Sequence, residues 1–362
     1  MAEQTKIAIV GWGNIGRGVF EAIKTNESLY GDVALEAIIS RRPEQVEKET
    51  DSSYLCSRNG VETSKGFNIL ALQHIEGLEN LESDVAILCG GSKDDLPVQG
   101  PFLARRFSTV DSFDTHKNIA DYTDEKTQSP AVGYFNSVDA NARVTGHLSA
   151  VSFGWDPGTF SLERVLMESF LPGAKAYAFY GLGKNGGLSM GHSDALRTIK
   201  GVKDARQYTH ALLSTVEEIR KGKKLDLAQR DMHWRECFVV LENDIAEEKT
   251  RVKLEAIQMP NYFKPYKTVV TSVSQEGLAE IDRERGVFHD GLVIAVGENG
   301  EVLEYKNIWP SNPLGTAGIL VATARAVHRL YSEGKRGAIT SLDIPPAYYS
   351  PRSRDELLKN IM

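Results

Sequence analysis

A short segment near the start of the chain has the residue types and spacing needed to bind a phosphate-bearing coenzyme. The apolar run 6–10 passes directly into Gly11-Trp12-Gly13-Asn14-Ile15-Gly16, and residues 17–23 are typical of a helix. In this G-x-G-x-x-G pattern the first glycine allows a tight turn, the second admits a pyrophosphate and the third lets the helix pack against the strand. The helix N-terminus then offers free N–H groups to the phosphates. The segment predicts a dinucleotide site, with a ligand-free glycine turn as the alternative.

The end of the next apolar run indicates which dinucleotide. Residues 34–39 suit a buried parallel strand, and Ser40, Arg41 and Arg42 follow it. NAD enzymes place an acidic residue about 20 positions after the glycines. Guanidinium groups instead donate paired, charge-assisted hydrogen bonds to a phosphate. We therefore expect NADP(H), with Arg41 and Arg42 on the 2′-phosphate and Ser40 assisting. A solvated basic loop is the alternative.

Three later strand ends carry polar residues. The apolar run 85–89 leads into Gly90-Gly91-Ser92, and ligands bind at the carboxyl ends of parallel strands, so Gly90 and Ser92 are further coenzyme candidates. Residues 108–114 predict a strand whose tip carries two acids, Asp111 and Asp114. Residues 148–154 predict another, ending in a turn headed by Asp156. Such acids could act on a substrate, or could be helix caps and turn residues.

Composition limits the class of protein. The chain has 362 residues, 41% of them hydrophobic, which is enough for two domains. Its net charge of −7 argues against a general nucleic-acid or membrane surface. No apolar run approaches the ~20 residues of a membrane span. A strand begins within the first few residues, so we expect no signal peptide and a cytoplasmic location. The three scattered cysteines, Cys56, Cys89 and Cys237, fit neither a disulfide framework nor a metal site.

The remaining pattern predicts an α/β protein of two domains. The first is a Rossmann-type parallel-sheet dinucleotide-binding domain, residues 1–154, with a surface excursion over 44–65, a helix from Leu96 to Ala104 and a loop followed by a helix over 121–141. The second is an α+β domain with a largely antiparallel sheet and helices on one face, residues 155–312. We expect helices over 160–166 and 214–221 and strands over 176–180, 236–241, 267–273 and 292–296. Residues 313–362, with a small-residue helix over 316–331 and a strand over 338–342, should pack back on the first domain.

Three further segments carry a resemblance to a known family. They are Gly154-Trp155-Asp156-Pro157-Gly158 with Phe160-Ser161, the run 187–197 (GLSMGHSDALR) continuing to Gln207-Tyr208-Thr209, and Cys237-Phe238-Val239-Val240 preceded by Arg235. With the glycine motif, Ser40 to Arg42 and Thr109-Val110-Asp111, they closely resemble meso-diaminopimelate D-dehydrogenase, in the same order along nearly the whole chain. The resemblance implies NADP-dependent, reversible oxidative deamination of meso-2,6-diaminopimelate at its D centre. The products are L-2-amino-6-oxopimelate (tetrahydrodipicolinate) and ammonia, in lysine and diaminopimelate biosynthesis. It also implies a homodimer with a second domain that dimerises and binds substrate.

The resemblance assigns roles to individual residues. Asp114 and Asp156 would hold the amino group at the D centre, where they would orient its C–H bond toward the nicotinamide. Arg235 would clamp a distal carboxylate. The other implied substrate contacts are Tyr180, Met190, Gly191, Thr209, His289 and Asn312. His289 could equally be structural, and His192 could relay a proton or merely fix its loop.

Two departures from the family pattern affect the expected substrate specificity, and other functional hypotheses also remain. The family often has Trp at the position of Tyr180 and Gln at that of Met190, and a looser pocket would admit other D-amino acids. Extra sequence occurs over 44–80, 121–141 and 184–186. The looser pocket makes a D-amino acid dehydrogenase of relaxed specificity one alternative. Two further alternatives, which do not depend on these departures, are another NADP-dependent reductase and a non-catalytic NADP(H) sensor. A dihydrodipicolinate reductase or homoserine dehydrogenase would need a paired-His or Lys-bearing loop, which we do not find. A sensor would not need Asp114, Asp156, Thr209 and Arg235 together.

Overall fold

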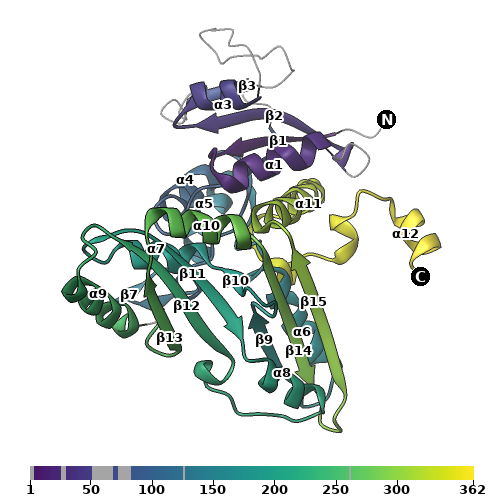
Figure 1. Cartoon of the computed structure of the whole chain (residues 1–362). Helices are drawn as coiled ribbons and strands as arrows, with labels where there is room; N and C mark the ends of the chain where they lie inside the picture. Colours follow the sequence, from purple (N-terminus) through teal and green to yellow (C-terminus); the bar gives the residue numbers. More distant parts are fainter. Residues whose placement is uncertain (1–3, 26–29, 51–67, 72–82, 125–126, 261) are drawn as a thin grey trace. The chain divides into compact units, whose positions relative to one another are not determined.

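The computed structural model describes residues 4–25, 30–50, 68–71, 83–124, 127–260 and 262–362. The chain forms two compact units (Figure 1). Unit 1 comprises Met1–Leu162 and Pro313–Met362, and unit 2 comprises Glu163–Asn312. Helix α6 (Thr159–Phe170) passes from the first unit into the second.

Unit 1 is built on a parallel sheet. Seven described strands pair in the order β16-β8-β5-β4-β1-β2-β3, and every pairing is parallel. Their bounds are β1 (Thr5–Val10), β2 (Val33–Ser40), β3 (Asn68–Ala71), β4 (Val85–Leu88), β5 (Ser108–Asp111), β8 (Leu148–Ala150) and β16 (Gly337–Ile339). The predicted Rossmann-type domain is thus confirmed. The chain runs outward from β1 in both directions, so β1 and its glycine turn lie at the topological switch point.

Helices cover both faces of this sheet because its strands are apolar on both sides. Ile7 and Ile9 point to the face covered by α1 (Asn14–Thr25) and α11 (Asn312–Ser332). Ala8 and Val10 point to the other face, covered by α4 (Leu96–Ala104) and α5 (Tyr134–Thr145). Each fully buried isoleucine contributes about 1.5–3 kcal/mol of hydrophobic stabilisation. The two packed faces hold the strand ends, and thus the turns that follow them, in fixed positions.

Several predicted boundaries in unit 1 are wrong. Strand β5 ends at Asp111, not at residue 114, and β8 ends at Ala150. Asp111 is completely buried, and it accepts hydrogen bonds from the backbone N–H groups of Phe113 and Ser152 and from the Tyr134 hydroxyl. Of the two acids predicted at this strand tip, Asp111 is therefore a structural acid that fixes the turn. Part of the expected surface excursion is helix α3 (Pro43–Thr50), and the rest lies outside the described residues.

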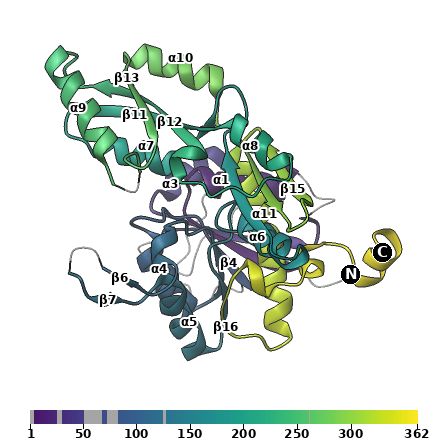
Figure 2. The ribbon, with the colours of Figure 1, turned by 90° about the horizontal axis from the view of Figure 1, so that it is seen from below.

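The remaining elements of unit 1 are short. Strands β6 (Tyr122–Thr123) and β7 (Pro130–Ala131) form a small hairpin, which projects beyond α4 (Figure 2). The predicted helix after it is α5. The other described elements are η2 (His116–Asn118), η4 (Ser341–Asp343), η5 (Pro346–Tyr349) and α12 (Arg354–Asn360).

Unit 2 contains two sheets. The four-stranded one has the order β10-β11-β12-β13, with strands β10 (Gly187–Leu188), β11 (Val202–Ala211), β12 (His233–Leu241) and β13 (Lys267–Ser272). The three-stranded one has the order β15-β14-β9, with β9 (Lys175–Tyr180), β14 (His289–Val296) and β15 (Val302–Trp309). All pairings are antiparallel except β12 with β13. The predicted α+β class is confirmed, with two sheets in place of one.

The larger sheet of unit 2 has helices on both faces, whereas we expected them on one. Cys237 and Val239 pack with α7 (Met190–Arg197) and α9 (Ala246–Gln258), and Phe238 and Val240 pack with α10 (Gln275–Arg285). Helix α8 (Leu213–Arg220) corresponds to the helix predicted over 214–221, and it buries Val216 and Ile219 against the smaller sheet. A single-turn helix, η3 (Gln229–Asp231), precedes β12.

Candidate active site

The glycine turn after β1 has the shape of a phosphate cradle. Gly11 has φ +104°, and its N–H donates to the Ile39 carbonyl oxygen at 2.8 Å. A Cβ on Gly16 would collide with the Gly11 carbonyl oxygen, so helix and turn touch here. A Cβ on Gly13 would meet nothing within 4 Å. The first and third glycines are therefore required by the fold, while Gly13 leaves its backbone open to a ligand. Asn14 and Ile15 open α1 directly behind it.

The basic segment after β2 lies beside this turn, because β1 and β2 are neighbours. The buried Ser40 hydroxyl accepts a hydrogen bond from the Arg42 backbone N–H at 3.0 Å, which folds the segment into a tight turn. The Arg41 side chain is 71% exposed and reaches Asp95 at 3.4 Å. Both guanidinium groups are therefore available to a phosphate at this edge of the sheet, which fits the 2′-phosphate of NADP(H).

The other candidate residues of unit 1 follow the same edge. In sheet order they are Asp156 after β8, Asp114 after β5 and Ser92 after β4, and the glycine turn and the Arg segment come next. The Ser92 hydroxyl accepts from the Asp114 backbone N–H at 3.1 Å. Asp156 accepts from the Ser161 hydroxyl at 3.4 Å, within the turn closed by Gly154 and Gly158. Three inter-strand steps, about 14 Å, separate the strand ends of β2 and β5. The edge therefore offers phosphate donors at one end and carboxylates at the other.

Unit 2 contains a buried arginine with no described counter-ion. Arg235 and Thr209 are register partners on β12 and β11, are 7% and 2% exposed, and the guanidinium donates to the Thr209 hydroxyl. The guanidinium also lies over the Tyr266 ring, 4.1 Å from its centroid. Its Nε has no hydrogen-bond partner, and no acidic side chain lies within ion-pair distance of it, among the residues that the structure describes. Burial lowers the pKa of Arg235. An uncompensated buried cation is costly, and it is well suited to bind an anionic group.

Neutral histidines surround Arg235. His233 lies two residues before it on the same face of β12; its Nε2 accepts from the Tyr180 backbone N–H at 2.9 Å, and its ring stacks on the Tyr180 ring. Burial and the charge of Arg235 lower the pKa of His233 and of His192 to about 3. Burial alone lowers the pKa of His289 to about 3. All three rings are neutral near pH 7, so Arg235 is the source of positive charge. Sequence reasoning missed His233 and Tyr266, although the alternation of His233 with Arg235 on one strand was a usable signal.

The other candidate residues of unit 2 lie at different distances from the Thr209–Arg235 pair. The His289 ring packs against Gly187, whose register partner is Thr209, so His289 is brought beside the Thr209–Arg235 pair. Met190 and Gly191 open α7, whose first turn lies close enough for Arg235 to affect His192. Met190 is 45% exposed, and a Cβ on Gly191 would meet nothing within 4 Å. The Asn312 backbone N–H donates to Val287, two residues from His289.

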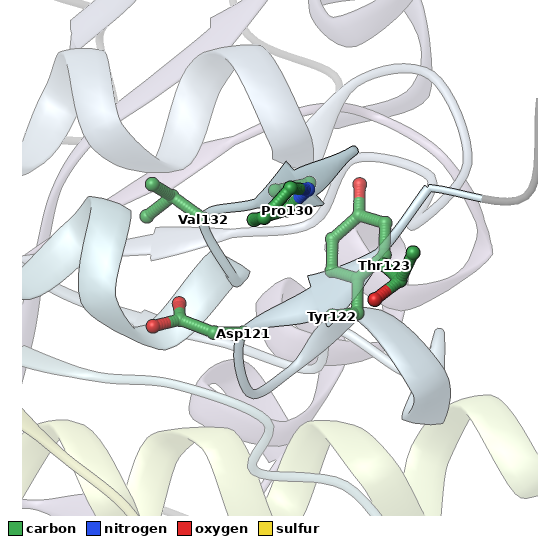
Figure 3. A pocket seen from close by; sticks show the side chains of 6 residues that line it. Asp121, Tyr122, Thr123, Pro130 and Val132 are labelled. Atoms are coloured by element: carbon green, nitrogen blue, oxygen red, sulfur yellow. The ribbon is translucent and has the colours of Figure 1, made fainter. Parts of the chain in front are cut away.

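Two hollows in the described part of the chain are lined by residues other than the candidate site residues. A shallow hollow of about 500 Å³ lies at the β6–β7 hairpin and is lined by Asp121, Tyr122, Thr123, Pro130, Ala131 and Val132 (Figure 3). A second, of about 260 Å³, lies at the amino edge of the parallel sheet, opposite the glycine turn. In the described ranges no group of three or more His, Cys, Asp or Glu side chains could hold a metal ion. Across the same residues no helix is long and apolar enough to span a membrane.

The fold and the candidate residues define a class. A parallel sheet with a glycine turn, an arginine segment beside it and acids further along the same edge is typical of a dinucleotide-dependent dehydrogenase. The buried Arg235 of unit 2, with no described acidic partner, is compatible with a small anionic substrate.

Comparison with known proteins defines the family. The diaminopimelic acid dehydrogenase C-terminal domain matches residues 154–308. The meso-diaminopimelate D-dehydrogenases of Lysinibacillus sphaericus and Corynebacterium glutamicum are 40% and 34% identical, each over at least 98% of both chains. The solved C. glutamicum DAP dehydrogenase in complex with DAP superposes with a TM-score of 0.81 at 32% identity, covering 100% of both chains. An engineered D-amino acid dehydrogenase bound to NADP+ gives 0.78 at 31% identity, covering 99% of this chain and 100% of its own. The chain belongs to the meso-diaminopimelate D-dehydrogenase family.

Proposed function

We propose that this chain catalyses the NADP-dependent, reversible oxidative deamination of meso-2,6-diaminopimelate at its D centre. The products are L-2-amino-6-oxopimelate, which cyclises to tetrahydrodipicolinate, and ammonia. Family membership supports the reaction, and the observation in this chain that carries it is Arg235, a buried guanidinium with no described acidic partner. The substrate has two carboxylates, and such a site gains most from binding one of them.

The coenzyme is assigned to the carboxyl edge of the unit 1 sheet. The N–H groups around Gly13, Asn14 and Ile15 would hold the pyrophosphate, and Ser40, Arg41 and Arg42 the 2′-phosphate. Gly90 and Ser92 follow the neighbouring strand and would border the coenzyme further along. NADP+, when bound, supplies the hydride acceptor. The open space at Gly13 and the exposed Arg41 side chain support this assignment.

Asp114 and Asp156 are assigned to the reacting amino group. Two carboxylates hold an ammonium group by charge-assisted hydrogen bonds and fix the direction of its C–H bond. The nitrogen must lose a proton as the hydride leaves, and a carboxylate or water can accept it. Water then adds to the imine carbon, and ammonia leaves.

The residues of unit 2 are assigned to the far end of the substrate. Arg235 would bind a carboxylate through two parallel N–H groups, and Thr209, Asn312 and the Gly191 N–H would add neutral hydrogen bonds. His289 is neutral at physiological pH because of burial, so it would donate as an imidazole and add no charge. Tyr180 and Met190 would form the walls of the pocket.

We further infer a homodimer located in the cytoplasm that binds no nucleic acid. Strands β13 and β15 end their sheets and leave Val269 and Ile308 about half exposed, which fits pairing with a second copy. Cys89 and Cys237 are free and buried, which fits a reducing compartment. Light scattering of the purified protein measures the assembly.

An isomer and coenzyme panel tests the proposed function. The purified protein is given meso-, LL- or DD-diaminopimelate with NADP+ or NAD+, and the absorbance of the reduced coenzyme is followed. We expect rapid reduction of NADP+ with the meso isomer alone. Equal rates with LL- and meso-diaminopimelate, or no reduction of NADP+ by any isomer, contradict the assignment.

Relaxed specificity is the second candidate, favoured by the exposed and flexible Met190 side chain. The test is reductive amination of pyruvate or phenylpyruvate with ammonia and NADPH. NADPH oxidation above the blank supports relaxed specificity, and no oxidation above the blank contradicts it.

A further inference from the structure

One carboxylate in unit 1 receives hydrogen bonds from three side chains at once. Glu49 accepts from the Trp12 indole N–H at 2.8 Å, from Arg17 Nε and Nη2 at 2.6 and 3.0 Å, and from Gln45 Nε2 at 2.7 Å. These bonds hold the pKa of Glu49 at about 2, chiefly through Arg17, so the group is ionised throughout the physiological range. Nothing in the proposed reaction uses it.

Glu49 and its donors lie next to the two segments that are assigned to the coenzyme phosphates. Trp12 lies inside the glycine turn, between Gly11 and Gly13, and Arg17 lies in the first turn of α1. Glu49 and Gln45 lie on α3, which begins directly after Arg42. Three of the Glu49 hydrogen bonds therefore tie the helix that follows the 2′-phosphate segment to the turn that cradles the pyrophosphate.

We propose that Glu49 is a positioning residue that sets the preference for NADP(H) over NAD(H). It does so by fixing the Arg41–Arg42 segment relative to the glycine turn. This inference rests on the coenzyme assignment in the proposed function and deepens it.

The two phosphate sites depend on Glu49 to different degrees. The glycine turn is held by its own backbone, because Gly11 N–H bonds to Ile39, Arg17 N–H bonds to Gly13, and Gly16 packs on Gly11. Arg41 is largely exposed and lies two residues before α3, a short and mostly polar helix, so the placement of its backbone depends on how α3 is held. A ligand with both phosphates needs both segments in place, and preorganisation reduces the entropy lost on binding. A ligand without the 2′-phosphate needs only the turn.

An ordinary surface ion pair would not have this effect. Exposed pairs add little to stability, and Arg220–Glu304 in unit 2 is such a pair, with nearly the same bidentate geometry and exposure as Arg17–Glu49. What distinguishes Glu49 is the third partner, since Trp12 is only 5% exposed and its N–H would lose a charged acceptor. Glu304→Gln is therefore a matched control for Glu49→Gln.

The experiment measures dissociation constants of NADPH and NADH from the fluorescence of the reduced nicotinamide, for wild type, Glu49→Gln, Glu304→Gln and Trp12→Phe. Melting temperatures are recorded in parallel. For Glu49→Gln we expect the NADPH constant to rise about tenfold and the NADH constant to change by less than about twofold. Trp12→Phe, which keeps an aromatic side chain but removes the indole N–H together with the five-membered ring, should change NADPH binding in the same direction by a smaller factor. Glu304→Gln should change neither constant.

Two results overturn the inference while leaving the proposed function intact. One is an unchanged NADPH constant in Glu49→Gln with a lowered melting temperature, which makes Glu49 purely structural. The other is an equal rise for both coenzymes, which confines its effect to the pyrophosphate turn. A wild-type protein that binds NADPH and NADH equally refutes the coenzyme assignment itself, and the inference with it.

Discussion

Replacing Arg235 by methionine separates a binding role from a structural one, because the two roles predict opposite changes in stability. Methionine fills much of the same space without charge or donors. A charge-assisted hydrogen bond contributes about 1.5–3 kcal/mol, so losing two parallel bonds to a substrate carboxylate costs at least about 3 kcal/mol. That corresponds to a rise of roughly a hundredfold or more in the KM for meso-diaminopimelate. Arg235→Lys keeps the charge without the planar fork and should fall between.

The same substitution should stabilise the ligand-free protein. Arg235 is buried with no described acidic partner, and burial lowers its pKa, so the folded state carries the cost of the charge. Removing about 1 kcal/mol of that cost raises the melting temperature by about 2–4 °C for a unit of this size. Such a gain at the expense of activity is typical of residues kept for function.

The assay pairs steady-state kinetics with thermal unfolding of the ligand-free protein. Arg206→Met is the matched control, because Arg206 lies on the adjacent strand β11 but is paired with Asp204 and Asp282. It should lower the melting temperature and leave KM nearly unchanged. An unchanged KM in Arg235→Met, or a melting temperature lowered as in Arg206→Met, would exclude a substrate-binding role for Arg235.

Further substitutions test the roles of the glycine turn, the two carboxylates and His289. Gly13→Ala should weaken NADPH binding at an unchanged melting temperature, because its Cβ meets only open space. Gly16→Ala should lower both the NADPH affinity and the melting temperature, because its Cβ collides with the turn. Identical behaviour of the two variants in calorimetry and coenzyme titration would contradict this difference. Asp114→Asn and Asp156→Asn should each lower kcat by roughly 10²–10⁴-fold with unchanged NADPH affinity, and stopped-flow hydride transfer at the wild-type rate would exclude the role. The folded-state pKa of His289 is about 3, below the unfolded value of about 6.5, so the unfolded chain binds more protons between these values. The contribution of the neutral His289 ring to stability is therefore complete above pH 6.5 and is lost toward pH 3. The free energy of unfolding falls there by up to about 1.4 kcal/mol per pH unit. His289→Asn should flatten the fall in melting temperature between pH 6.5 and 5, and an unchanged slope would count against a buried neutral ring.

The parts of the fold that were predictable have strong local signals. Strand β4 is fully apolar and β1 and β2 are largely so, and the predicted helix that corresponds to α11 is rich in small apolar residues. The glycine turn could be predicted because its conformation requires glycine at positions 11 and 16. The family resemblance rested on segments that now lie at β10 to β12 and at the turn containing Asp156.

The elements that escaped prediction derive their stability from partners distant in sequence. Strand β11 carries Arg206, which pairs with Asp282 on α10, so its polar positions look like those of a loop until the partner is known. Helices α9 and α10 are rich in charge, and α10 buries little beyond Leu278. Likewise, the chain gives no local sign that Asp111 turns inward to bind Tyr134 and Ser152, or that Tyr266 lies under Arg235.

The proposed reaction removes hydride from the D centre of meso-diaminopimelate, and isotopic labelling identifies the carbon that loses it. Substrate carrying deuterium at only the D or only the L α-carbon is oxidised with NADP+, and the NADPH is examined by mass spectrometry. We expect deuterated NADPH from the D-labelled substrate and unlabelled NADPH from the L-labelled one. Deuterium arriving from the L carbon, or from both carbons, would contradict it.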